Sequence, residues 1–87
     1  SEMVINPRVI AFRIKYDNPM AHTTLANSIT LTPGTVTLNL TEDGLYEIHA
    51  LTDGAAEGLL GGGMQQKVAD LFGEPFIYEV VEGGEVQ

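Results

Sequence analysis

Five hydroxyl side chains gather around one Pro-Gly corner of this chain, and hydroxyls of this kind can act as nucleophiles. They flank Pro33 and Gly34 in the stretch LANSITLTPGTVTLNL and are Ser28, Thr30, Thr32, Thr35 and Thr37. A nucleophilic Ser in a hydrolase sits between glycines on a sharp turn from a strand to a helix. The residues around Ser28 read ANSIT, without glycine and inside a predicted helix. We therefore expect no catalytic residue and no enzymatic activity.

Two histidines, His22 and His49, are the next candidates for chemistry. Neither stands in an H-x-H or H-x-x-x-H pair, and the chain has no Cys, so the spacing predicts no metal site. Imidazole titrates near neutral pH, so His49, beside Glu47 on a predicted strand, is a candidate pH-responsive contact. An ordinary half-exposed strand residue explains the same position. Both interpretations stay open.

A glycine-rich segment, GLLGGGMQQK, includes Gly61, Gly62 and Gly63, but lacks the G-x-x-x-x-G-K-[ST] spacing that cradles phosphate. A flexible loop or a close backbone contact explains the glycines with fewer assumptions. Most carboxylates fall in predicted turns and tails, where solvation is the default state. We therefore expect no cofactor.

Charge is distributed unevenly along the 87 residues, whose net charge is −8. Three bases and two acids stand in residues 1–41, whereas one base and ten acids stand in residues 42–87. This balance excludes binding to nucleic-acid backbones, which selects clustered Lys and Arg. No apolar run approaches the roughly 20 residues that a membrane-spanning helix needs. The sequence thus predicts a soluble domain without nucleic-acid partners.

The elements that position these residues follow from hydrophobic periodicity. Residues 9–16 and 45–51 alternate as strands. The expected buried faces are Ile10, Phe12, Ile14 and Tyr16 in the first and Tyr46, Ile48 and Ala50 in the second. Asn18 and Pro19 predict the start of a helix that ends before Pro33. Alternation over 35–41 predicts a strand whose buried face is Val36, Leu38 and Leu40. Residues 52–58 read as a loop or ragged helix start. A regular helix then begins near Gly63 or Met64, and a last strand covers FIYEVV. The apolar stripe of this second helix is Leu60, Met64, Val68, Leu71 and Phe72.

This order, β-α-β-β-α-β, predicts an α+β fold of the ferredoxin-like (split βαβ) class. We expect a four-stranded, mainly antiparallel sheet with two helices on one face. Residues 1–87 then form a single soluble domain with an ordered core of about 5–82.

The same stretch carries a family likeness. LANSITLTPGTVTLNL followed by DGLYEIHAL resembles the cytoplasmic part of the MnhE/MrpE-like subunit of the multisubunit Mrp/Mnh-type monovalent cation (Na⁺)/proton antiporter. The family has the form A-N-x-I-T-L-T-P-G-T before a strand and V-H-x-L at the end of a later one. The positions that match are Ala26, Asn27, Ile29, Thr30, Leu31, Thr32, Pro33, Gly34, Thr35, His49 and Leu51, with Ile48 in place of Val.

This resemblance implies a non-catalytic accessory or scaffold domain of a Na⁺/H⁺ antiporter at the cytoplasmic face of the cell membrane. Its partners are then the other antiporter subunits, and N-terminal transmembrane helices tether it in a longer protein. The matched residues around Pro33-Gly34 are the expected interface, and the isolated domain is expected to self-associate. Two alternatives stay open: a regulatory module that binds protons, cations or a small ligand through His49 and the acidic second half, and the equivalent subunit of a membrane-bound hydrogenase-type complex.

Overall fold

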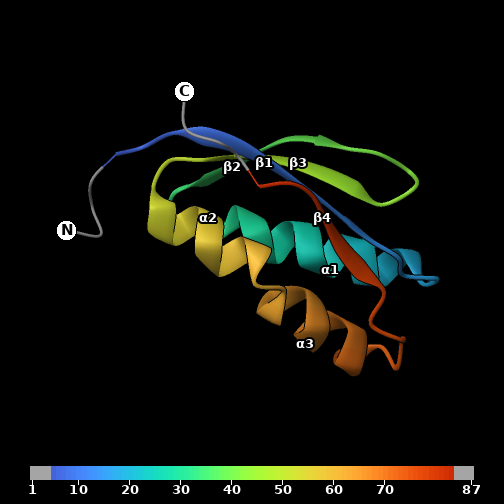
Figure 1. Ribbon diagram of the computed structural model, residues 1–87. Helices are drawn as coiled ribbons and strands as arrows, with labels where there is room; N and C mark the ends of the chain where they lie inside the picture. Colours follow the sequence, from blue (N-terminus) through green and yellow to red (C-terminus); the bar gives the residue numbers. More distant parts are fainter. Residues whose placement is uncertain (1–4, 84–87) are drawn as a thin grey trace.

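Four strands and three helices make up the described part of the chain, residues 5–83 of the computed structural model. In chain order they are β1 (Arg8–Ile14), α1 (Pro19–Thr30), β2 (Thr35–Leu40), β3 (Leu45–Ala50), α2 (Asp53–Leu60), α3 (Gly63–Leu71) and β4 (Tyr78–Glu82). The sheet order is β2-β3-β1-β4, and all neighbours are antiparallel. All helices lie on one side of the sheet (Figure 1). This arrangement confirms the predicted ferredoxin-like fold class.

The core lies between the central strands and the helices. Ile10, Phe12 and Ile14 of β1 and Tyr46 and Ile48 of β3 are all fully buried, as the alternation predicted. The rings of Phe12 and Tyr46 stack with centroids 4.9 Å apart. From α1 the core receives three side chains at helical spacing, Ala21, Leu25 and Ile29. Burial of apolar side chains from three elements fixes α1 against the sheet.

The start of α1 is held by its own cap and by a distant carboxylate. The Asn18 side chain accepts a hydrogen bond from the Met20 amide at 2.9 Å, and Pro19 is the first helical residue, as predicted. Glu74, which follows α3, accepts hydrogen bonds from the amides of Asp17 at 2.8 Å and Asn18 at 2.7 Å. These contacts tie the β1–α1 connection to the α3–β4 connection.

The second helical connection begins with a helix over residues 53–60, one of the two interpretations left open for residues 52–58. The Thr52 hydroxyl caps α2 by accepting from the Ala55 amide at 3.1 Å. Gly62, with φ of +83°, separates α2 from α3, which begins at Gly63 as expected. The apolar stripe predicted for the second helix is wrong at Leu71, whose side chain is exposed. Gln65, which was not part of that stripe, is buried instead. The buried Gln65 side chain donates through Nε2 to the Leu59 carbonyl at 3.0 Å, whereas its Oε1 is buried with no hydrogen-bond partner among the described residues.

The prediction that β2 buries Val36, Leu38 and Leu40 is also wrong, since all three are exposed. The register gives the reason. Val36 pairs with His49, which pairs with Val9, whereas Thr37 pairs with Ile48 of the helix-facing core. Val36 therefore lies on the side of the sheet that faces away from the helices. The register shift between Thr37 and Asn39 then places Leu40 opposite Tyr46, on the helix side of the sheet. Leu40 is still 39% exposed, and among the described strands β2 has a neighbour on one flank only.

Candidate functional site

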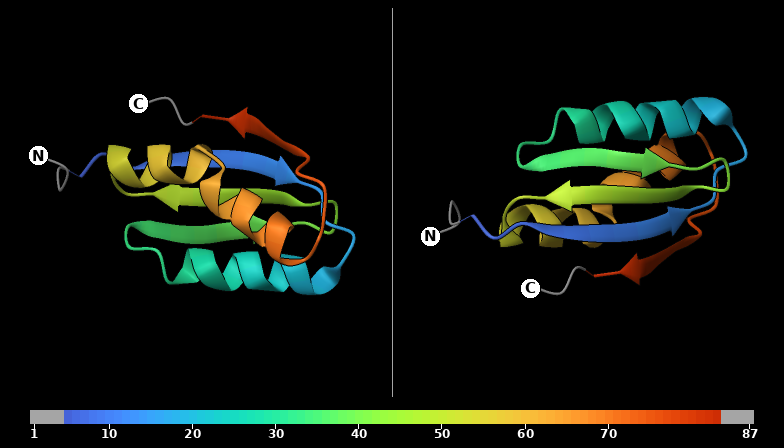
Figure 2. Two further views of the ribbon diagram at one scale, coloured as in Figure 1. Left: turned by 90° about the horizontal axis from the view of Figure 1, so that it is seen from below. Right: turned by 90° about the horizontal axis from the view of Figure 1, so that it is seen from above.

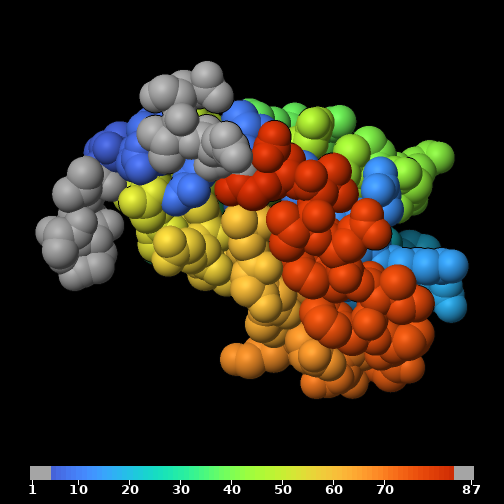
Figure 3. Space-filling model, viewed as in Figure 1, coloured from blue at the N-terminus to red at the C-terminus, as the bar shows by residue number. Residues whose placement is uncertain are grey.

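The longest uncharged segment of the chain forms one side of the molecule. Residues 18–41 contain no Asp, Glu, Lys or Arg, although such residues make up 18% of the sequence. They fold into α1, the Pro33-Gly34 corner and β2, and α1 runs beside β2 in both views of Figure 2. We call this surface, residues 18–41, the uncharged flank. The side seen in Figure 3 is formed instead by β4, the segment before it and α3, which carry Asp70, Glu74, Glu79 and Glu82.

The hydroxyls of the flank are directed back into the chain. Six of the eight bond a backbone carbonyl: Thr23 to Pro19 (3.3 Å), Thr24 to Met20 (2.8 Å), Ser28 to Thr24 (2.9 Å), Thr30 to Ala26 (3.0 Å), Thr32 to Ser28 (3.0 Å) and Thr35 to Ile29 and Thr32 (3.2 Å each). The Thr41 hydroxyl donates to the Asp43 carboxylate instead. Such back-bonding satisfies the O–H donors within the chain. The surface therefore needs fewer outside hydrogen-bond partners than its composition indicates. Ser28 is also engaged in its own helix rather than poised beside a base.

Large apolar side chains stand exposed among these satisfied hydroxyls. Their exposed fractions range from 39% to 83%, and they are Met20, Leu31, Val36, Leu38 and Leu40. Leu31, at 83%, is the most exposed of them and directly precedes the corner. Contiguous exposed apolar surface without charge is typical of docking sites, so the flank is a candidate for one.

The structure brings the two parts of the family-like motif together. Residues 26–35 form the end of α1, the corner and the first residue of β2, while His49 and Leu51 stand on β3 and directly after it. The Leu51 amide donates to the Gly34 carbonyl at 2.8 Å, and His49 lies opposite Val36. Gly34 has φ of +84°, and a Cβ there would lie 3.2 Å from that of Ala55 on α2. Glycine is required at this corner by both its conformation and its packing.

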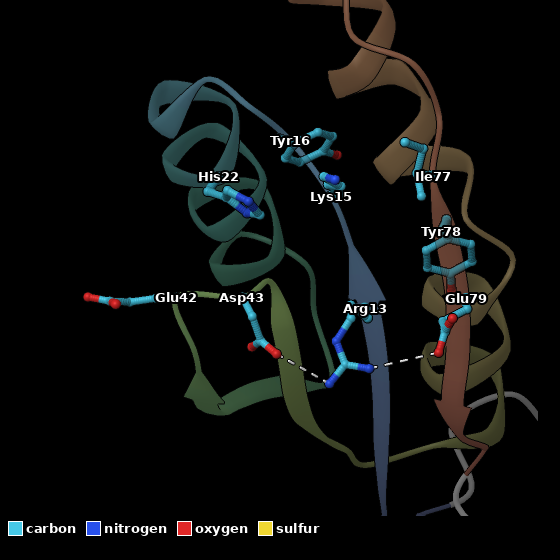
Figure 4. Close-up of a pocket in the computed structure, with 9 residues that line it drawn as sticks. All are labelled: Arg13, Lys15, Tyr16, His22, Glu42, Asp43, Ile77, Tyr78 and Glu79. Atoms are coloured by element: carbon cyan, nitrogen blue, oxygen red, sulfur yellow. Dashed lines mark ion pairs between the residues drawn. The ribbon is translucent and has the colours of Figure 1, made fainter.

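A second cluster contains His22 rather than His49. It lines a cavity of about 410 Å³ formed by Arg13, Lys15, Tyr16, His22, Glu42, Asp43, Ile77, Tyr78 and Glu79 (Figure 4). His22 Nδ1 lies 3.0 Å from the Tyr46 hydroxyl, and its ring centroid is 4.9 Å from that of Tyr16. Burial lowers the pKa of His22, and the nearby Glu74 carboxylate opposes that shift. Burial also raises the pKa of both tyrosines, which stay protonated at neutral pH.

Charged groups of both signs edge this cavity. The Arg13 guanidinium lies 3.5 Å from an Asp43 oxygen and 3.8 Å from a Glu79 oxygen (Figure 4). The hydrogen bond from the Thr41 hydroxyl lowers the pKa of Asp43 most, and the positive charge of Arg13 lowers it further. Within residues 5–83 no three His, Asp or Glu side chains converge to hold a metal ion. Sequence spacing did not reveal the cluster, because Tyr16, His22 and Tyr46 come from three different segments.

A groove lies next to the corner, between it and α2. Its volume is about 440 Å³, and its lining residues are Thr32, Pro33, Thr52, Gly54, Ala55, Gly58, Leu59 and Met64. None of them is charged. The groove thus extends the uncharged surface from the corner onto the second helical connection.

Comparisons with known proteins agree with the motif. The sequence model of the family described as Na⁺/H⁺ ion antiporter subunit (MNHE) matches residues 1–68, most of the chain. Curated proteins and solved structures give no match. No helix within residues 5–83 is both long and apolar enough to cross a membrane.

Proposed function

The chain belongs to the MNHE family of Na⁺/H⁺ ion antiporter subunits, and from that premise we propose that it is a non-catalytic scaffold domain at the cytoplasmic face of the antiporter. Family membership makes the chain a component of a multisubunit Na⁺/H⁺ antiporter complex in a membrane. Its proposed role is to dock on neighbouring subunits through the uncharged flank. Its N-terminal end is proposed to continue into transmembrane helices of the full-length protein.

The observation that carries this proposal is the chemistry of the flank. It combines a charge-free run of residues, hydroxyls bonded to the chain's own carbonyls, and exposed apolar side chains. Burying one Leu or Met side chain yields about 1.5–3 kcal/mol, so a few of these residues suffice for a stable contact. The orientation of Val36 fits the same role, since an edge strand normally turns its apolar side toward its own core and Val36 faces away from the helices.

Charge favours a protein partner over a lipid surface. Amphipathic segments that bind membranes present Lys and Arg to anionic headgroups, but residues 18–41 have neither. The net charge of −8 adds repulsion from such a surface. Three of the four Lys and Arg residues lie within residues 8–15, near the proposed membrane connection. This placement supports the cytoplasmic side, where positive residues accumulate next to membrane spans.

The test replaces exposed apolar residues of the flank in the full-length subunit of the assembled complex. Leu31→Asp and Leu38→Asp each place a charge on the flank, and Leu71→Asp, on α3 with 73% exposure, is the matched control. We expect both flank variants to lose co-purification with the other subunits and to reduce sodium resistance of the cells. Leu71→Asp retains both. Normal assembly of both flank variants would remove the flank from the interface and with it the proposed docking role.

A second candidate function, regulation by pH, is favoured by the His22 cluster. The imidazole is half-buried beside two tyrosines and faces an open cavity. His49 lies on the helix-free side of the sheet, away from the His22 cluster. The hypothesis that His49 is a pH-responsive contact is therefore separate from this one and stays a prediction. NMR titration of the domain with acid, Na⁺, Ca²⁺ and small anions separates these ideas. Chemical-shift changes centred on His22 and lining residues of the cavity support a sensor, whereas their absence leaves the scaffold role alone.

A further inference from the structure

We propose that the free edge of β2 receives an extended, uncharged segment of a neighbouring antiporter subunit, which pairs with β2 as an added strand of the sheet. This inference rests on the proposed docking function and names the mode of contact. Among the described strands, in the order β2-β3-β1-β4, β2 has β3 as its only neighbour. Main-chain groups of β2 carry the inference, whereas exposed side chains carry the docking role.

Alternate residues of β2 direct their backbone N–H and C=O groups away from β3. The Leu51 amide donates to the Gly34 carbonyl at 2.8 Å, so Gly34 faces β3. In an antiparallel ladder, pairs that exchange hydrogen bonds alternate with pairs that do not. Further along the same register, the Thr37–Ile48 pair is therefore of the non-bonded kind. The backbone groups of Thr37 point out of the sheet, and no contact among residues 5–83 outside the ladder bonds them.

The same arrangement recurs beyond the register shift of β2. The Thr41 amide donates to the Leu45 carbonyl at 3.0 Å, so the Leu40–Tyr46 pair next to it is again non-bonded. Thr37 and Leu40 thus each offer an outward backbone donor and acceptor. A helix uses its own backbone groups internally and would leave these groups unpaired in an interface. An extended chain pairs with them, which is the way peptides add to a sheet edge.

The two edges of the sheet differ in their protection. Natural edge strands carry charge or Pro, because their backbone groups would otherwise pair with other chains. β4, at one edge, contains Glu79 and Glu82. β2, at the other, reads TVTLNL, without charge or Pro, and residues 36–40 are all exposed. β2 is therefore the edge that is open to pairing.

Helix α1 provides a base for an added strand. In both views of Figure 2, α1 lies outside β2, past the edge of the sheet, and Figure 1 places it on the helix side. Because α1 is offset in this way, Thr37 and Leu40 stay exposed although they lie on the helix side of β2. A strand added to β2 would continue the sheet across α1 and lie beside both side chains.

The offset of α1 also excludes a second copy of this chain. Two β2 strands joined about a two-fold axis would place both α1 helices on the same side of one continuous sheet. Each helix projects past the edge of its own sheet, so the two helices would overlap. The occupant is therefore a segment of a different protein that brings no such helix with it.

Charge defines the segment further. No residue of α1 or β2 is charged, so a charged side chain in the paired segment would lose hydration without gaining a partner. Glu42 and Asp43 follow β2 at the hairpin tip, and they disfavour acidic residues at that end in particular. Glu47, on β3, already accepts a hydrogen bond from the Asn39 side chain at 3.2 Å. An uncharged segment remains the one that fits.

The experiment removes one outward N–H group of β2 from the full-length subunit in the assembled complex. Thr37→Pro deletes this donor, Thr37→Ala changes the side chain alone, and Val80→Pro is the matched control on β4. Val80 faces outward in the same way, because the Lys15 amide donates to the Ile77 carbonyl at 3.0 Å and the bonded pairs alternate from there. Pro is tolerated in edge strands where the N–H faces outward.

We expect Thr37→Pro to lower co-purification with the other subunits about tenfold, whereas Thr37→Ala and Val80→Pro assemble normally. Thermal unfolding of the 87-residue chain checks that each variant is folded. Normal assembly of a folded Thr37→Pro variant would overturn the proposal. So would equal losses in Thr37→Pro and Val80→Pro, because the effect would then not be specific to β2.

Amide hydrogen exchange tests the same contact without a substitution, and it decides the matter if Thr37→Pro does not fold. In the complex, the amides of Thr37 and Leu40 are expected to exchange at least about tenfold more slowly than in the free 87-residue chain. The Val80 amide is expected to keep its rate. Equal rates of Thr37 and Leu40 in the two states would overturn strand pairing. The chain has no Cys, so a cross-link from Thr37→Cys identifies the occupant, and a link to a second copy would overturn the assignment to another subunit.

The outcomes also separate this inference from the docking role. If Leu31→Asp and Leu38→Asp block assembly while Thr37→Pro assembles and the outward amides stay unprotected, the flank docks through its side chains and strand pairing is wrong. If Thr37→Pro blocks assembly and the amides are protected while both Asp variants assemble, the edge of β2 is paired and the apolar side chains are not the interface.

Discussion

Gly44, at the tip of the β2–β3 hairpin, is expected to tolerate no side chain, so Gly44→Ala destabilises the domain strongly. Its φ is +85°, and a Cβ built on it would lie 2.1 Å from the Ile14 carbonyl oxygen. The same two residues are joined in the structure, because the Ile14 amide donates to the Gly44 carbonyl at 3.1 Å. The hairpin tip is thus packed directly onto the end of β1, the central strand that carries Ile10, Phe12 and Ile14 of the core.

The size of the effect follows from two contributions. A non-glycine residue in left-handed backbone costs roughly 1–2 kcal/mol. Relief of the clash moves the tip away from β1 and removes a hydrogen bond worth about 1 kcal/mol. Together they give a loss of about 2–3 kcal/mol. A domain of this size loses about 4–8 °C of melting temperature for each kcal/mol, so we expect the midpoint to fall by at least about 8 °C.

The assay is thermal and urea unfolding of the 87-residue chain, with Gly58→Ala as the matched control. Both variants change Gly to Ala, so the entropy change in the unfolded chain is the same and cancels in their difference. Gly58→Ala adds a methyl group in open space on a helix and is expected to stabilise by about 1 kcal/mol. The two midpoints then move in opposite directions. A Gly44→Ala midpoint within about 2 °C of the parent, less than 1 kcal/mol of change, would show that the hairpin tip does not pack on β1.

Three further substitutions test the core, the pH response and the flank. Phe12→Ala is expected to cost about 3–5 kcal/mol in urea unfolding, because the ring is fully buried against Tyr46, and a loss below 1 kcal/mol would contradict that packing. The folded-state pKa of His22 lies below its unfolded value of 6.5, so its contribution to stability is complete above pH 6.5 and is lost as pH falls through the folded pKa. His22→Gln is expected to flatten the dependence of melting temperature on pH between pH 8 and 5 relative to the parent. An unchanged slope in His22→Gln would refute this prediction. Thr35→Val removes the hydroxyl that bonds the Ile29 and Thr32 carbonyls and is expected to lower the free energy of unfolding by about 1 kcal/mol. Thr37→Val, the control, has no such bond to lose. Equal melting temperatures of the two variants would contradict this prediction.

Local signals in the sequence were sufficient for the architecture. Asn18 and Pro19 marked the start of α1, and the alternation over β1 and β3 named the buried side chains correctly. These signals succeed because capping and two-residue periodicity depend on near neighbours. The sequence left residues 52–58 open between a loop and a ragged helix start because Gly54 and Gly58 lower helix propensity. A helix forms there because the Thr52 cap and burial of α2 against the core outweigh that cost.

The failure at β2 was of a different kind, and it bears on the candidate site. Alternation shows that one side of a strand is apolar, but it does not show which side of the sheet that is. The orientation was set by the β3 register, which placed Thr37 beside Ile48 and turned Val36 away from the helices. An apolar strand face without a partner in its own domain is unfavourable for a chain that acts alone, and it is favourable where a neighbour covers it. The position at which sequence reasoning failed is therefore part of the surface that we assign to docking.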